Sequence, residues 1–140
     1  MRGLRNTYLD LDLPLLRTIS EMAGIELSAS TARSAALELA DTMQDPAVID
    51  LVIAGLTDDA RLALYELMAA GGRVPVATFA RRFGEVRPLG SSARERERPH
   101  IYPAHPTEAL LYRGLIGRAF RDDGSGPQEF IYVPDELMQL

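Results

Sequence analysis

The 140-residue sequence predicts a mainly α-helical fold that carries one small β-hairpin. Apolar residues recur three or four positions apart through most of the chain, which is the spacing of helices with one buried face. Gly and Pro residues divide this pattern into short segments and mark helix starts and ends. Near the C-terminus, two alternating polar and apolar stretches surround a Gly-rich turn, which is the pattern of a hairpin.

Two helices are expected within the first 43 residues. Pro14 fits the first turn of a helix that continues to about Ala23, because a missing amide costs nothing there. Ser28 or Ser30 can cap a second helix that continues to about Met43.

The next two helices have stronger start signals. Asp45 and Pro46 place a capping carboxylate before a proline at the first helical position, and this helix is expected to end near Gly55. Thr57 can cap a further helix, which the pair Gly71-Gly72 ends.

The rest of the chain alternates short elements with one long connection. Residues 73–76 are expected to be extended and 77–83 to form a short helix. Residues 85–105 lack a periodic pattern and predict a long irregular loop, which in a compact domain is usually functional or mobile. Pro106 begins a helix that is expected over 106–117, with Gly114 or Gly117 weakening its end, and that leads into the hairpin.

The hairpin strands are expected at 118–121 and 130–133. These elements divide the chain into an N-terminal helical subdomain, residues 1–56, and a second unit, residues 57–134. Residues 135–140 are the start of a further helix or a linker.

The composition limits the function classes. The chain is 46% hydrophobic and 25% charged, values typical of a globular protein. Absence of Cys excludes a disulfide framework, a thiolate zinc site and a Cys nucleophile. Absence of Lys excludes a phosphate-binding loop of the NTPase type within these residues. His100 and His105 have no supporting ligands nearby in sequence, so no metal or cofactor is expected.

The chain is also expected to be cytoplasmic, with no membrane contact. The longest uncharged apolar stretch, residues 51–56, is far too short to span a bilayer. The N-terminus leads into Asp10 and Asp12, which does not fit a signal peptide.

Charge is distributed unevenly along the chain. All 15 basic residues are Arg, and the net charge is −5. Residues 1–70 have a net charge of −6, residues 71–121 of +6 and residues 122–140 of −5. The ten arginines of 71–121 either face an anionic partner or pair with the acidic first half, and the sequence leaves both readings open.

From Thr57 to Val133, the order of expected elements is helix, short strand, helix, loop, helix and hairpin. This order resembles the winged-helix class, a helix-turn-helix followed by a hairpin. The residues that carry the likeness are Ala70-Gly71-Gly72, Arg73-Val74-Pro75, Phe79-Ala80-Arg81-Arg82-Phe83-Gly84 and Leu110-Leu111-Tyr112-Arg113-Gly114-Leu115-Ile116. The resemblance implies that helix 106–117 lies in the major groove of DNA while the hairpin touches the backbone.

The candidate contacts follow from that placement. Glu108, Tyr112 and Arg113 are expected to point outward from helix 106–117. The full set of candidate nucleic-acid-binding residues is Arg81, Arg82, Arg87, Tyr112, Arg113, Arg118 and Arg121. Two features oppose DNA binding: the acidic Glu108, and Asp122 with Asp123 near the hairpin tip.

Two further resemblances extend this reading. Residues 13–25 and 28–33 resemble the helix–extended–helix pattern of SAP and Rho N-terminal modules, which often bind nucleic acid, although only Arg33 stands in for their basic residue. The whole chain resembles the N-terminal helical and winged-helix region of bacterial helicase-associated, XPB-type proteins. The residues that carry this likeness are Gly114-Leu115-Ile116, Phe130-Ile131-Tyr132-Val133-Pro134 and Asp135-Glu136-Leu137.

The resemblance implies a non-catalytic module of a larger protein. The sequence therefore predicts a non-enzymatic module that binds nucleic acid, with double-stranded DNA as the favoured partner and no small-molecule substrate. The alternative is a module for protein–protein interaction or dimerisation that docks through the apolar helix 106–117, because a fold of this class does not settle its function.

Overall fold

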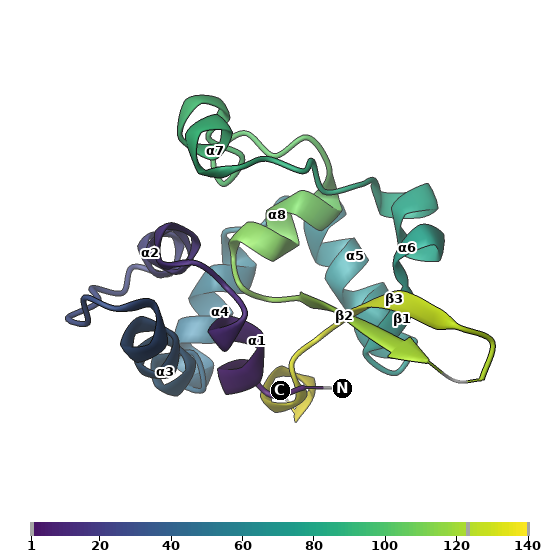
Figure 1. Ribbon diagram of the computed structural model, residues 1–140, viewed down its shortest axis with the longest axis horizontal. Coiled ribbons are helices and arrows are strands. Elements are labelled where there is room, and N and C mark those ends of the chain that lie inside the picture. Colours follow the sequence, from purple (N-terminus) through teal and green to yellow (C-terminus); the bar gives the residue numbers. More distant parts are fainter. Residues whose placement is uncertain (1, 123, 140) are drawn as a thin grey trace.

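A computed structural model describes residues 2–122 and 124–139 (Figure 1). The first half forms α1 (Leu4–Leu9), α2 (Leu13–Met22), α3 (Ala32–Thr42), α4 (Pro46–Ala54) and α5 (Asp58–Ala69). The second half forms β1 (Arg73–Pro75), α6 (Val76–Phe83), α7 (Ser91–Glu97), α8 (Pro106–Tyr112), β2 (Gly117–Asp122), β3 (Pro127–Tyr132) and the 3-10 helix η1 (Asp135–Gln139). A mainly helical fold with a small antiparallel sheet is thus confirmed.

Side-chain caps start the helices where the sequence signals are strong. The Asp45 carboxylate accepts a hydrogen bond from the Ala47 amide at the start of α4. The Thr57 hydroxyl accepts one from Ala60 at the start of α5. These bonds satisfy amides that lack a partner within the helix, which is why the two starts are readable from sequence.

The cap of α3 differs from the expectation. Thr31, and neither Ser28 nor Ser30, accepts a hydrogen bond from the Ser34 amide. Ser28 is held instead by the carboxylate of Glu38, which accepts from its amide at 2.9 Å.

Three other elements differ from the prediction. Helix α1 was not expected, and it owes its order to packing against α3, with Leu4 and Tyr8 fully buried. The region predicted as an irregular loop, residues 85–105, contains helix α7. Helix α8 ends at Tyr112, well before Gly117, because Gly114 adopts a left-handed conformation with φ +72° that breaks the helical path.

The three strands form one sheet in the order β1-β3-β2, in which all neighbours are antiparallel. Ile131 on β3 is paired with Val74 on one side and with Arg118 on the other. Since cross-strand neighbours share a face, these residues lie on what we call the helix-side face of the sheet, against α6. The opposite, outer face includes the paired residues Arg121 and Gln128.

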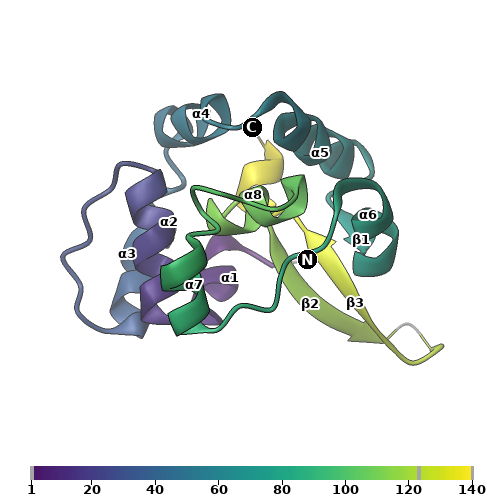
Figure 2. The same ribbon diagram turned by 90° about the horizontal axis from the view of Figure 1, so that it is seen from above.

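Helices of the first half pack directly onto the second half. The hydroxyl of Tyr8 donates a hydrogen bond of 2.9 Å to the carbonyl of Gly114, and Thr7 shares one of 2.8 Å with the Tyr132 hydroxyl. The predicted boundary at 56/57 falls in the turn between α4 and α5, yet residues from both sides of it join one buried cluster. The hairpin projects from the end of the molecule opposite α2 and α3 (Figure 2).

Candidate nucleic-acid interface

Among the described residues, ion pairs account for four of the ten arginines in residues 71–121. The pairs are Arg82 with Glu66, Arg87 with Glu108, Arg94 with Asp12 and Arg96 with Glu97. Only Arg82 and Arg94 pair with the acidic first half of the chain. Within the described residues, pairing with that half therefore does not explain the basic segment.

Arg87 has a structural role, because it pairs with a buried carboxylate. Glu108 is fully buried, and its carboxylate accepts hydrogen bonds from the Arg87 guanidinium at 2.7 Å, from the Arg87 amide at 3.0 Å and from the Ala104 amide at 2.9 Å. Burial alone would raise the pKa of Glu108, but these bonds outweigh it and hold that pKa below its ordinary value. One carboxylate thus fastens both ends of the segment 87–104.

That segment covers the face of α8 that was expected to enter the DNA groove. Every residue of α8 from Thr107 to Tyr112 is buried. In Figures 1 and 2, α7 lies beside α2 and the connections on either side of it approach α8. The expectation that Glu108 and Tyr112 point outward is therefore wrong, because the predicted loop folds back over them.

Arg113 is half-buried and has a structural contact. Its guanidinium donates to the carbonyl of Gly55, at the C-terminal end of α4, over 3.4 Å. A cation is favourable at a helix C-terminus because the unsatisfied carbonyls carry partial negative charge. Burial lowers the pKa of Arg113.

Four exposed arginines surround the hairpin and α6 without an ion pair among the residues described: Arg73, Arg81, Arg118 and Arg121. Arg118 lies on the helix-side face of the sheet, and Arg81 extends from the neighbouring α6. Arg73 and Arg121 lie on the outer face, where Arg73 stacks over Phe130 at 5.4 Å from the ring centroid. The hairpin therefore presents guanidinium groups on both of its faces.

The contacts predicted from the sequence do not include Arg73, although its place in a short extended segment beside Pro75 marks it as a candidate surface strand residue. Its partner strand β3 lies almost 60 residues further along the chain, so the sequence alone did not bring it to the hairpin.

One of the acidic residues that opposed DNA binding is engaged in the hairpin turn. The Asp122 carboxylate accepts hydrogen bonds from the amides of Gly124 at 2.9 Å and Gly126 at 3.2 Å. This is the usual way in which Asp shapes a turn through its own backbone. Asp123 lies outside the described residues.

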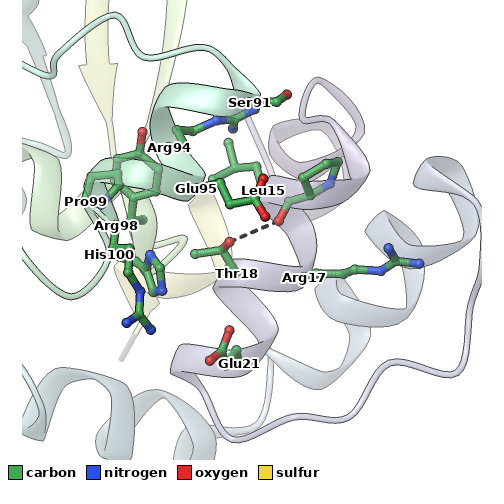
Figure 3. A pocket seen from close by; sticks show the side chains of 12 residues that line it. Leu15, Arg17, Thr18, Glu21, Ser91, Arg94, Glu95, Arg98, Pro99 and His100 are labelled. Atoms are coloured by element: carbon green, nitrogen blue, oxygen red, sulfur yellow. Dashed lines mark hydrogen bonds between the residues drawn. The ribbon is translucent and has the colours of Figure 1, made fainter.

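A cavity of about 450 Å³ separates α2 from α7 (Figure 3). Its charges largely compensate one another, because Arg94 binds Asp12 and the lining has two further arginines, Arg17 and Arg98, with two glutamates, Glu21 and Glu95. The Arg17 guanidinium points away from the side chains of α7 in Figure 3. The cavity therefore offers no surplus of positive charge for an anion.

Two properties of the described residues concern metal sites and membrane-spanning helices. The described residues include no group of three or more His, Cys, Asp or Glu side chains placed to hold a metal ion. None of their helices has the length and apolar character that a membrane crossing requires.

Comparison with known proteins assigns the chain to no family. No protein-family model matches the chain, and no curated protein or solved structure is significantly similar to it.

Proposed function

We propose that this chain is a non-enzymatic, winged-helix module of a larger cytoplasmic protein, and that it binds double-stranded nucleic acid through its hairpin. The observation that carries the proposal is a set of exposed arginines on and beside the hairpin that form no ion pair with a described residue: Arg73, Arg81, Arg118 and Arg121. The order α5, β1, α6, α8, β2, β3 supports the winged-helix reading.

The proposed contact differs from the one usual for winged helices. Helix α8 is buried, so it does not read bases. A two-stranded hairpin with guanidinium groups on both faces suits a position between two rows of phosphates, as in a groove of a duplex. Such contacts give affinity without sequence choice, because phosphates carry no base information.

Replacing Arg118 and Arg121 together by alanine tests the proposal. We expect weaker binding and a salt slope reduced by about two, since each lost phosphate contact lowers the slope by about one. The measurement is fluorescence anisotropy with a labelled duplex over a range of salt concentrations.

The matched control replaces Arg5 and Arg33, which are exposed residues of the N-terminal helices, by alanine. This variant has the same net charge as the first, so it separates local contact from overall charge. Equal loss of affinity in the two double variants would contradict the hairpin assignment.

A second candidate function, protein–protein interaction, is favoured by α4. This helix is apolar on nearly all sides, with Asp50 as its one charged residue, yet Leu51 is 72% exposed. A helix that is apolar all round is normally buried, so this face is suited to a protein partner or a second copy of the chain. Sedimentation of the wild type and of Leu51→Gln over a range of protein concentrations tests self-association through this face.

A further inference from the structure

A groove of about 580 Å³ lies between α6, residues 84–86 and the helix-side face of the hairpin. Its walls are mainly apolar, formed by Val76 and Ala80 of α6, by Val86, and by Ile131 of β3. Grooves of this size with apolar walls and a few polar groups are the usual form of sites for small organic groups.

The charged side chains of the groove are one arginine and two glutamates. Arg118 lines it from β2, while Glu85 and Glu129 add two carboxylates for which the structure gives no ion pair with a described residue. Thr107 also lines the groove, and its side-chain hydroxyl is buried without a hydrogen-bond partner in the described chain. A buried hydroxyl without a partner is unfavourable, so it marks a place where a bound group would be accepted.

These carboxylates do not suit a surface that binds phosphates alone. Next to Arg118 they would repel a second phosphate, so a ligand that fits must combine one anionic end with hydrogen-bond donors at the other. A flat, largely apolar body must connect the two ends if it is to fill the space between α6 and β3.

We propose that the groove holds a single unpaired nucleotide of the bound nucleic acid, with its phosphate on Arg118 and its base between the walls. Guanine is the preferred base, because its Watson–Crick edge has adjacent N–H groups. These can donate hydrogen bonds to a carboxylate such as that of Glu129 or Glu85. The proposal rests on the nucleic-acid-binding function proposed above and specifies its substrate: a duplex that contains an unpaired guanine.

The test compares two fluorescein-labelled duplexes of identical sequence by anisotropy, one fully paired and one with a single-guanine bulge. We expect the full chain to bind the bulged duplex about tenfold more tightly, the usual contribution of one held base. A third probe with a thymine bulge is expected to bind more weakly than the guanine bulge.

Two variants locate the site. Ala77→Phe places a ring in the groove from an exposed position of α6 and is expected to remove the preference for the bulge while leaving affinity for the paired duplex. Ala54→Phe is the matched control, since Ala54 is exposed on α4 and does not line the groove. Glu129→Gln tests the base contact at a surface position and is expected to reduce the difference between guanine and thymine bulges.

The outcomes separate this inference from the proposed function. Equal affinity for paired and bulged duplexes, or an unchanged preference in Ala77→Phe, overturns the nucleotide site and leaves the hairpin contact standing. Absence of binding to every probe overturns the proposed function itself.

Discussion

Replacing Glu108 by alanine is expected to lower the free energy of unfolding by about 1–3 kcal/mol. The variant leaves the Arg87 guanidinium and the amides of Arg87 and Ala104 without the acceptor that all three now share. The two amides lose their acceptor at a place covered by the chain, which is costly, whereas the Arg87 side chain is 34% exposed and its charge can be hydrated. Urea denaturation followed by circular dichroism gives the change.

The effect is expected to be local as well as global. Since Glu108 holds both ends of segment 87–104, its loss should speed hydrogen exchange at the amides of that segment and at the α8 residues beneath it. None of the residues of α7 is buried, so little else fastens the middle of the segment besides the pair between Arg94 and Asp12.

Two further variants sharpen the test. Adding Arg87→Ala to Glu108→Ala is expected to cost little more than Glu108→Ala alone, because the Arg87 guanidinium has by then already lost its acceptor. The matched control is Glu66→Ala, which breaks the more exposed pair with Arg82 and is expected to change stability by no more than about 1 kcal/mol. A Glu108→Ala variant as stable as the Glu66→Ala variant would rule out a buried ion pair at this place.

The same contact has a predictable pH dependence. Because the pKa of Glu108 is lowered in the folded state, its contribution to stability is fully present above the ordinary carboxyl pKa of about 4.3 and is lost as pH falls through the lower, folded value. The pKa of Asp12 is also lowered: burial raises it, but the hydrogen bonds from Arg94 and Leu15 outweigh burial. We expect Glu108→Gln to unfold less steeply with acid than the wild type when both are followed by circular dichroism.

Helices with local signals could be predicted from the sequence, and those that depend on distant contacts could not. The starts of α4 and α5 are set by side chains two or three residues away from the amides they cap. Helix α1 has no side-chain cap of this kind; its first amide, that of Leu4, donates to Glu136, which lies 132 residues along the chain. A local sequence pattern therefore could not predict that hydrogen bond.

The candidate site shows the same division. Arg118 and Arg121 lie on the hairpin strand that the alternating pattern predicted, and both are exposed although they face opposite sides of the sheet. The burial of Tyr112 and Glu108 could not be predicted from the sequence. The periodic pattern of helix α8 is the same whether the face that carries these residues is exposed to water or covered by another segment. The covering contact joins Glu108 to Arg87, 21 residues away, across a stretch that has no periodic pattern of its own.

Replacing Gly114 by alanine is expected to lower the free energy of unfolding by about 2–5 kcal/mol, from two sources. Its φ of +72° is unfavourable for a residue with a side chain. In addition, an added Cβ would lie 2.8 Å from both the Ile19 side chain and the Tyr8 hydroxyl. These residues belong to α1 and α2, so the strain acts where the N-terminal helices pack onto the residues that lead into the hairpin.

Gly24→Ala separates the two sources. Gly24 has nearly the same φ, +70°, but nothing lies within 4 Å of the Cβ that alanine would add. We expect this control to show the backbone cost alone, about 1–2 kcal/mol, in the same urea denaturation experiment. If Gly114→Ala were no more destabilising than Gly24→Ala, the contact of Tyr8 and Ile19 with Gly114 would not be a tight one. A larger loss in a single unfolding transition would instead mean that the N-terminal helices and the hairpin fold as one cooperative unit, since this junction joins them.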